Sequence, residues 1–194
     1  MITIVDYGMG NLRSVRKAFQ ECGADVSVSA DPAQVGRADA LVLPGVGAFG
    51  EAVKRLDALG LREPVLEHVS HEKPLLGICL GMQLFFDRSE ENPEARGLSI
   101  MSGGLKRFPA GVKSPHIGWN DMDVCGNATV AGQPGCFYFV HSYYVPESQW
   151  AVGLTDYSCR FVSAVEKGPV VGVQFHPEKS QTAGLELIRR FLKL

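Results

Sequence analysis

Apolar residues in the first half of the chain fall into short runs separated by stretches with a different spacing. The runs at residues 2–7, 38–44 and 74–79 are almost continuously apolar, and residues 25–29 alternate between apolar and polar. Continuous apolar runs of this kind are typical of parallel strands that are buried on both faces. We therefore predict four strands in this part of the chain.

Helical spacing fills most of the gaps between these strands. After Asn11, a good N-cap residue, apolar residues recur every three or four positions, at Leu12, Val15, Phe19 and Cys22. Further helices are predicted around residues 51–59 and 61–71, from residue 80 onward, and at 182–194. Strands that alternate with helices predict an α/β fold, with an open, flavodoxin-like and mostly parallel sheet covered by helices on both faces.

The second half of the chain changes to short β-rich runs. They lie between about residues 97 and 174, at 116–124, 136–145, 150–157 and 160–175. The last run contains Lys167-Gly168-Pro169, a turn sequence that predicts a hairpin. We therefore expect additional antiparallel β-hairpins in this half. The sequence has no internal repeat and no linker, which favours a single domain spanning residues 1–194.

Composition and charge exclude several classes of function. Of the 194 residues, 45% are hydrophobic and 21% are charged, as in ordinary soluble globular proteins. The net charge of −2 gives no general attraction to nucleic acid or to an anionic membrane. No apolar run reaches the roughly 18 residues of a membrane helix, and no signal peptide is visible. We expect a cytoplasmic protein that binds neither nucleic acid nor membrane.

The chain has five cysteines, Cys22, Cys79, Cys125, Cys136 and Cys159. They form no CxxC pair, which is typical of reduced thiols and fits a cytoplasmic location. Only Cys79 has neighbours that suggest chemistry. It lies between Gly77 and Gly81, where the strand at 74–79 is expected to turn into a helix. This is the pattern of a nucleophile elbow, a strained turn in which only glycine leaves room for the crossing backbone. A helix N-terminus also favours the thiolate form of cysteine.

A thiolate nucleophile needs a proton carrier, and His176 has the best surroundings for that role. It ends an apolar strand and is followed by Pro177 and Glu178. Pro177 favours extended geometry at His176, and residues two apart in an extended segment point the same way. Glu178 is therefore expected to hold Nδ1 of His176, which leaves Nε2 free to exchange a proton with sulfur. The sequence thus predicts a Cys-His-Glu triad.

The remaining histidines suggest no further site. His68 and His71 share one face of a polar helix, but no carboxylate or cysteine cluster accompanies them, so we expect a solvated face and no metal. His116 and His141 lie in β-rich runs and are expected to be structural. The loop LPGVGAFG has Gly45 and Gly47, which let backbone N–H groups turn outward as an oxyanion hole requires.

Three stretches together resemble the class I (triad) glutamine amidotransferases: GICLGMQL, LPGVGAFG and HPEKS. The resemblance covers essentially the whole chain. It implies that Cys79 is the nucleophile, His176 the general acid and base, and Glu178 the residue that orients His176. It also implies an oxyanion hole formed by the backbone N–H groups of Val46 and Leu80. The glutamine-binding residues by the same resemblance are Gly45, Gly47, Gln83, His141, Ser142 and Tyr143.

Two further stretches, PHIGWN and FYFVHSYY, resemble more narrowly the glutaminase subunits of imidazole glycerol phosphate synthases. That resemblance implies L-glutamine as the substrate, with no cofactor and no metal. It also implies a heterodimer with a (β/α)8-barrel cyclase subunit. The cyclase would use the ammonia to make imidazole glycerol phosphate and an aminoimidazole carboxamide ribotide.

The partner is expected to cover the mouth of the site, because ammonia would otherwise escape into solvent as ammonium. The candidates for this contact lie beside the triad: Asn11, Trp119, Asn120, Tyr138 and Lys179. Tryptophan and tyrosine are the aromatic types that anchor interfaces, although ordinary core packing is the alternative role for both.

Other assignments share parts of this pattern. The glutaminase subunit of pyridoxal phosphate synthase has the elbow and triad, but PHIGWN and this form of LPGVGAFG are not expected there. A protease or redox chaperone with a cysteine elbow would lack the His-Pro-Glu segment, and glutamine turnover would separate the two. A binding module without activity would not need Cys79, His176 and Glu178 together.

Overall fold

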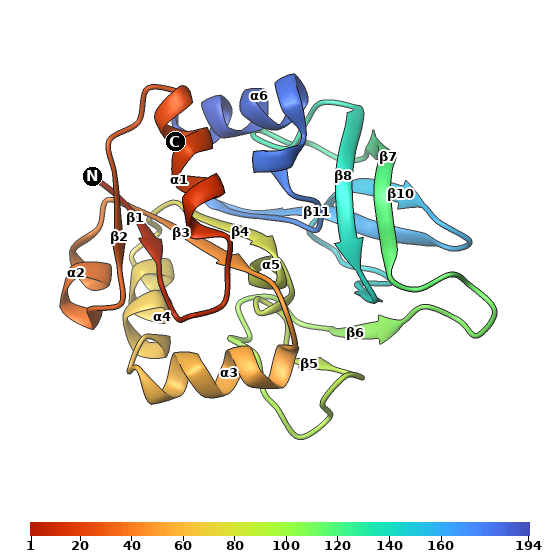
Figure 1. Cartoon of the computed structure of the whole chain (residues 1–194), viewed down its shortest axis with the longest axis horizontal. Coiled ribbons are helices and arrows are strands. Elements are labelled where there is room, and N and C mark those ends of the chain that lie inside the picture. The colour runs from red at the N-terminus through yellow and green to blue at the C-terminus, as the bar shows by residue number, and fades with distance from the viewer.

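The centre of the molecule is a nine-stranded sheet in the computed structural model, which describes all 194 residues, Met1–Leu194. The strands follow the spatial order β2-β1-β3-β4-β12-β11-β10-β7-β8 (Figure 1). Those from β2 to β12 pair parallel, and those from β12 to β8 pair antiparallel. The bounds of these strands are β1 (Ile2–Val5), β2 (Val26–Ser29), β3 (Ala40–Gly45), β4 (Leu75–Cys79), β7 (His116–Val124), β8 (Gly135–His141), β10 (Ala151–Asp156), β11 (Arg160–Lys167) and β12 (Val170–Val173).

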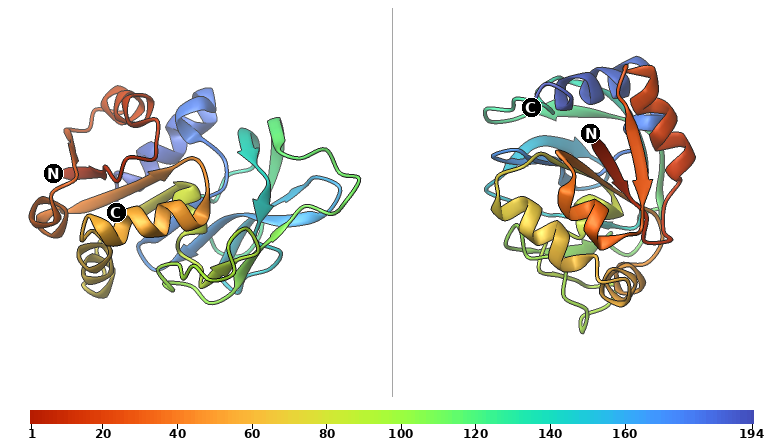
Figure 2. Two further views of the ribbon diagram at one scale, coloured as in Figure 1. Left: turned by 60° about the horizontal axis from the view of Figure 1, so that its bottom comes forward. Right: turned by 90° about the vertical axis from the view of Figure 1, so that its left-hand side faces the viewer.

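Helices cover both faces of the parallel part, as the views in Figure 2 show. Helices α1 and α6 pack on one face, and α2, α3 and α4 pack on the other. The two faces bury hydrophobic clusters of 26 and 25 residues, so the sheet lies between layers of similar size. The helices are α1 (Leu12–Glu21), α2 (Pro32–Arg37), α3 (Phe49–Ala58), α4 (Arg62–Ser70), α5 (Leu80–Gln83) and α6 (Gln181–Phe191), with a short 3-10 helix, η1 (Pro177–Lys179).

The sequence predictions for the fold are confirmed in their main features. The α/β class, the parallel strands of the first half and the antiparallel strands of the second half are all present. Asn11 caps α1 by accepting a hydrogen bond from the Ser14 N–H at 3.3 Å. The predicted hairpin joins β11 to β12 through Gly168, whose φ of 57° favours glycine. The antiparallel strands extend the main sheet instead of forming a separate one.

Two helical predictions need correction. Helix α2 was not predicted; Asp31 starts it by accepting from the Ala33 N–H at 2.9 Å, and Pro32 occupies its first position. The helix expected from residue 80 onward ends at Gln83. Its continuation is prevented because the carbonyls of Leu84 and Phe85 accept from Leu98 and Met101 of a distant segment, at 2.7 and 2.9 Å.

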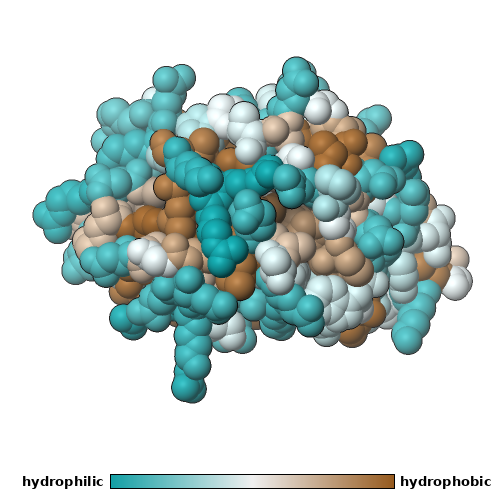
Figure 3. Space-filling model, turned by 90° about the horizontal axis from the view of Figure 1, so that it is seen from above, coloured by the Kyte–Doolittle hydropathy of each residue, from teal (hydrophilic) through white to brown (hydrophobic).

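A second, three-stranded sheet contains β5 (Arg88–Ser89), β6 (Gly104–Arg107) and β9 (Tyr143–Tyr144). No helix has the length and apolar character needed to cross a membrane. Seen from above, the surface is largely hydrophilic, and its hydrophobic residues are divided into separate patches (Figure 3). Single exposed hydrophobic residues are normal on such a surface.

Candidate active site

Cys79 occupies a strained turn between β4 and α5. Its backbone has φ 55° and ψ −110°, a conformation that residues with a side chain rarely adopt. The flanking glycines are needed for close approach. A Cβ on Gly81 would overlap the carbonyl oxygen of Leu43, and one on Gly77 would lie 2.5 Å from the ring of Phe85. The elbow predicted from the sequence is therefore present in the backbone.

His176 and Glu178 lie behind the cysteine and form a buried pair. Nδ1 of His176 is 2.8 Å from Oε1 of Glu178, and the two side chains are only 4% and 2% exposed. The expected geometry was wrong in one respect: residues 177–179 form the 3-10 helix η1, and only His176 is extended. Pro177 fits the first position of a helix, where its missing N–H leaves no bond unmade. A tight turn, and not an extended strand, brings the carboxylate back to the imidazole.

The electrostatics of His176 favour its charged form. Burial opposes an imidazolium, but interactions with Cys79 and Glu178 outweigh it and raise the pKa of His176 to about 10. The other two histidines of this region behave in the opposite way. Burial lowers the pKa of His116 to about 4 and that of His141 to about 3, so both rings stay neutral at physiological pH. A single imidazole of the site is thus suited to carrying a proton.

The candidate oxyanion hole lies where β3 and β4 end side by side. Gly45 pairs with Cys79 in the parallel register, which brings Val46 next to the start of α5. Leu80 is the first residue of that helix, so its N–H has no partner within the helix. Gly45 must be glycine because a Cβ would meet Leu80 at 2.8 Å, and Gly47 has a φ of 103°. Two backbone N–H groups can therefore face the same cavity.

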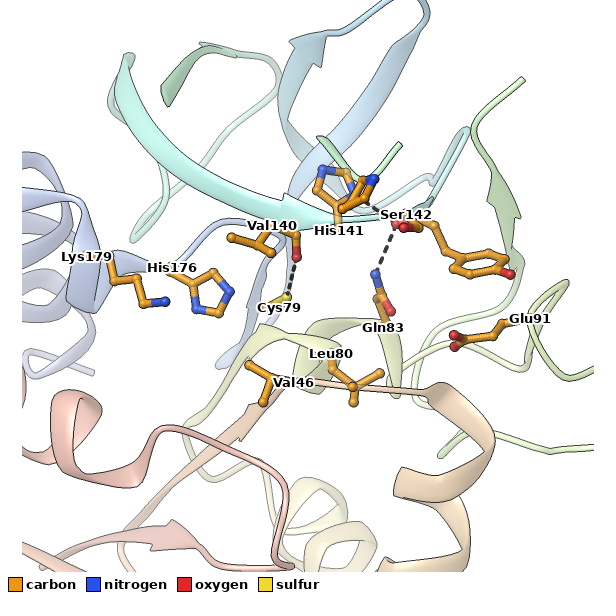
Figure 4. Close-up of a pocket in the computed structure, with 13 residues that line it drawn as sticks. Val46, Cys79, Leu80, Gln83, Glu91, Val140, His141, Ser142, His176 and Lys179 are labelled. Carbon is orange, nitrogen blue, oxygen red and sulfur yellow. Dashed lines mark hydrogen bonds between the residues drawn. The ribbon is translucent and has the colours of Figure 1, made fainter. Parts of the chain in front are cut away.

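A cavity of about 240 Å³ opens in front of Cys79 (Figure 4). Ten of the residues predicted from the sequence line it: Val46, Gly47, Cys79, Leu80, Gln83, His141, Ser142, Tyr143, His176 and Lys179. Glu178 bonds to Nδ1 of His176, and Gly45 is the last residue of β3; neither lines the cavity. Figure 4 shows Gln83 and Glu91 on the side of the cavity opposite His176 and Lys179.

Three lining residues were missed by the sequence predictions: Glu91, Pro115 and Val140. Glu91 is the only carboxylate among the lining residues, and its Oε2 also accepts from the Phe49 N–H at 2.7 Å. It lies in a polar stretch, SEENPEARG, which carries no signal that distinguishes it from a solvated loop. Pro115 could have been noticed, because it begins the PHIGWN stretch.

Of the five residues predicted for partner contact, three contact one another and only Lys179 lines the cavity. Trp119 is 48% exposed and packs edge-on against Tyr138, with ring centroids 6.0 Å apart. Nζ of Lys179 lies 5.6 Å from the centroid of the Tyr138 ring. Asn120 directs its side-chain N–H groups to the Asp156 carbonyl and to Nε2 of His116, and Asn11 is occupied as the α1 cap. Trp119, Tyr138 and Lys179 therefore form one continuous surface.

The histidines outside the triad differ in one case from expectation. His68 is 2% exposed, and its Nε2 is 2.9 Å from the carbonyl oxygen of Pro74, so the solvated face predicted for it was wrong. The side chain turns inward because α4 packs its apolar face against the sheet. No three histidine, cysteine or acidic side chains lie close enough together to hold a metal ion.

Comparison with known proteins identifies the family. The family model for glutamine amidotransferase class-I matches residues 3–194. The chain belongs to the class I glutamine amidotransferases. An imidazole glycerol phosphate synthase subunit HisH from Methanothermobacter thermautotrophicus is 46% identical to this amidotransferase, over 100% of the chain and 98% of that protein. The family and the narrower relationship predicted from the sequence are both confirmed.

Two other similarities place this amidotransferase in a wider setting. The imidazole glycerol phosphate synthase hisHF of Arabidopsis thaliana is 41% identical over 99% of the chain, which corresponds to 34% of that longer protein. A crystal structure of a glutamine amidotransferase superimposes with a TM-score of 0.80 at 20% identity, covering 100% of this chain and 98% of the other. The second similarity supports the fold alone.

Proposed function

We propose that this amidotransferase hydrolyses L-glutamine to glutamate and ammonia as the glutaminase subunit of an imidazole glycerol phosphate synthase. One observation carries the assignment of the site. Cys79, held at φ 55°, lines a cavity of about 240 Å³ together with His176, and Nδ1 of His176 is hydrogen-bonded to the buried carboxylate of Glu178. A cavity of that size suits an amino acid and not a protein substrate. We treat residues 1–194 as one amidotransferase domain.

The reaction follows from the roles of the three side chains. Sulfur of Cys79 attacks the side-chain carboxamide carbon of glutamine, and the resulting oxyanion lies between the N–H groups of Val46 and Leu80. The tetrahedral intermediate collapses as His176 protonates the leaving ammonia, which leaves a γ-glutamyl thioester. Water, activated by His176, then attacks the thioester and releases glutamate and the thiol. Glu178 keeps the imidazole in the orientation that both steps need.

The far end of the cavity suits the amino-acid group of glutamine. Glu91 offers a carboxylate for the α-ammonium group, and its second oxygen is already fixed by the N–H of Phe49. Gln83 donates from its Nε2 to the backbone carbonyl of Tyr143 and to the side-chain Oε1 of Gln174, so its own oxygen is free to accept from the ligand. The segment His141–Tyr143 closes the remaining side.

We further propose that the ammonia passes to a (β/α)8-barrel cyclase subunit. The hisHF relative, in which a chain like this one makes up 34% of the protein, supports a close association of two activities. The continuous surface of Trp119, Tyr138 and Lys179 is the best candidate for contact, and Asn11 and Asn120 are further candidates from the sequence. No cofactor is needed for this chemistry. The unpaired state of all five cysteines supports a cytoplasmic location.

The partner is also expected to switch the site on. Val46 is 44% exposed and flanked by glycines, so its peptide can reorient at low cost. With the N–H turned away, the loss of one oxyanion donor slows the reaction by about 10²–10³. Docking of the ribotide-bound partner would favour the productive orientation. A free chain that already hydrolyses glutamine at full speed would leave this loop as a fixed scaffold.

The decisive experiment is glutamine turnover by Cys79→Ser in the complex with the cyclase. Turnover should fall below detection, because a hydroxyl lacks the thiolate character of sulfur. Synthesis from added ammonia should continue, since it bypasses the triad. Cys136→Ser, a change at an exposed cysteine, is the matched control and should keep full activity. Glutamine turnover retained by Cys79→Ser would refute the assignment.

The same assay separates the alternatives. A glutaminase of the pyridoxal phosphate synthase type would not respond to the cyclase and its ribotide. A protease of this fold would cleave peptides and leave glutamine untouched.

A further inference from the structure

Gln174 is a buried polar residue that the mechanism above does not use. It is 0% exposed and lies between the end of β12 and His176. Its Nε2 is 3.7 Å from Sγ of Cys79, and its Oε1 is 3.0 Å from Nε2 of Gln83. A fully buried amide against a reactive sulfur needs an explanation, because burying such a group is costly unless its partners are well arranged.

The orientation of this amide is fixed by its neighbours. The carbonyl oxygen of Tyr143 can only accept, and it lies 3.0 Å from Nε2 of Gln83. The amino group of Gln83 must therefore face this carbonyl, and the same group also faces Gln174. Gln174 has to present its oxygen to Gln83, which leaves its own amino group directed at Cys79. The reverse orientation would place two amino groups 3.0 Å apart.

A second series of hydrogen bonds holds the same carbonyl in place. Nδ1 of His141 is 2.9 Å from the oxygen of Tyr143, and Nε2 of His141 is 3.0 Å from Nδ1 of His116. Burial lowers the pKa of His141 to about 3, so the ring stays neutral and keeps one donor and one acceptor. The donor faces Tyr143, and the acceptor faces His116. Tyr143 thus receives two hydrogen bonds from side chains that cannot reverse their roles.

Two titratable groups, His176 and Tyr7, interact with Cys79 electrostatically, and two further groups contact its sulfur with opposed effects. The carbonyl oxygen of Val140 is 3.6 Å from Sγ, drawn as a dashed line in Figure 4, and it can only accept a hydrogen bond from the neutral thiol. The amide of Gln174 can donate to the sulfur and therefore favours the thiolate. The balance between these contacts decides how readily the sulfur becomes a nucleophile.

We propose that Gln174 is a positioning residue for the nucleophile, donating a hydrogen bond to the Cys79 thiolate in an orientation imposed by Gln83 and the Tyr143 carbonyl. The inference rests on the proposed role of Cys79. Gln174 does not line the cavity, so it contacts Cys79 and Gln83 but not the substrate. Its effect belongs to the formation of the thiolate and not to the binding of the substrate.

The test measures alkylation of Cys79 by iodoacetamide across a range of pH, followed by mass spectrometry of the Cys79 peptide. Gln174→Met keeps a similar volume but removes the donor. We expect the midpoint of the alkylation profile to rise by about one pH unit, a tenfold loss of thiolate at a given pH. Gln83→Met keeps the amide of Gln174 as a donor but removes the side chain that orients this amide. It should raise the midpoint by a smaller amount than Gln174→Met does.

A matched control removes another buried polar contact from the same sheet. Thr155 Oγ1 donates to Ser163 Oγ at 2.8 Å, and neither residue lines the cavity. Thr155→Val should therefore leave the midpoint unchanged. Thermal unfolding of each variant checks that the protein is folded under the conditions of the alkylation assay. If Gln174→Met is not folded, the Gln83→Met profile alone decides.

The outcomes separate the inference from the assignment of the active site. Folded Gln174→Met with the midpoint of the unmodified chain would overturn the role of Gln174, whatever the outcome for Cys79→Ser. A Gln83→Met profile without a shift would overturn the imposed orientation. Loss of the Cys79 assignment would appear instead as glutamine turnover retained by Cys79→Ser.

Discussion

The two parts of the sheet build the active site by different means. In the parallel part, Cys79 is held by backbone contacts so close that Gly77 and Gly81 have no room for a side chain. In the antiparallel part, β7 and β8 hold the cavity wall through side-chain hydrogen bonds between buried histidines. The position of Cys79 thus depends on the space around the backbone of its neighbours. The position of the wall formed by β7 and β8 depends on which histidine nitrogens carry a proton.

β12 connects these parts and explains why the triad forms at this place. It pairs parallel with β4 and antiparallel with β11, and its Val173 lies opposite Ile78. The residues that follow the two neighbouring strands, Cys79 after Ile78 and His176 shortly after Val173, therefore emerge at the same edge of the sheet. Ligand sites of open α/β sheets lie at this edge.

Gly81→Ala should break the parallel part most severely. The added Cβ would overlap the Leu43 carbonyl, so β3 and β4 could not keep their spacing. We expect a loss of about 3 kcal/mol or more in the free energy of unfolding, together with loss of glutamine turnover. Denaturant unfolding measures the first effect. Gly36→Ala in α2 is the control, because nothing lies within 4 Å of its Cβ.

The control should be neutral or slightly stabilising, since alanine is favoured over glycine within a helix by about 1 kcal/mol. Equal stability of the two variants would show that the elbow tolerates a side chain.

Substitution within the triad should remove activity without affecting the fold. His176→Ala removes the proton carrier and should lower turnover by at least about 10²–10⁴. Glu178→Gln removes only the orienting charge, so its loss should be smaller, and Cys79 should remain open to alkylation. Steady-state glutaminase assays in the presence of the cyclase measure both. Turnover by His176→Ala at a near-normal rate would contradict the triad.

The sequence was most informative where a feature is local. The elbow glycines, the turn at Gly168 and the cap at Asn11 each depend on a few adjacent residues, and all three are found in the structure. The pairing of His176 with Glu178 was also predicted, although through an extended segment and not through a 3-10 turn. Local backbone preferences are strong enough to be recognised without knowledge of the fold.

Contacts between residues distant in the sequence could not be predicted to the same depth, and in the antiparallel part they depend on strand register. His116 meets His141 only because these residues are opposite each other in the β7–β8 ladder. Glu91 reaches the cavity from a polar loop, and Gln174 is read from the sequence as one more residue of a strand. The shortened α5 has the same origin, in carbonyls taken by a distant segment.

Acid should weaken the antiparallel part first. The pKa of His116 is lowered to about 4 in the folded chain by burial, below its ordinary value of about 6.5. Its stabilising contribution is therefore complete above pH 6.5 and is lost as the pH falls toward 4. The unfolded chain binds the additional proton in this range, so the free energy of unfolding falls by up to about 1.4 kcal/mol per pH unit.

The variant His116→Asn removes this titration. It should be less stable than the unmodified chain at pH 7, and the difference should shrink as the pH falls from 6.5 to 4. Urea unfolding at several pH values measures the difference. If the difference in free energy of unfolding between His116→Asn and the unmodified chain stays constant with pH, the pKa of His116 is not lowered by folding.

The smallest change in stability is expected at the surface where the two parts meet. Lys179 follows Glu178 in η1, and its Nζ lies 5.6 Å from the ring centroid of Tyr138 in β8. Lys179→Glu removes a cation–π contact worth about 0.5–1 kcal/mol at an exposed site, so the chain should stay folded. The reversed charge at the cavity mouth should nevertheless weaken association with the cyclase and lower glutamine-dependent synthesis.

The control is Lys193→Glu, which makes the same charge change at an exposed lysine near the C-terminus. Co-purification with the cyclase, compared between the two variants, isolates the effect of position from that of net charge. Association and synthesis equal to those of Lys193→Glu would remove Lys179 from the contact surface.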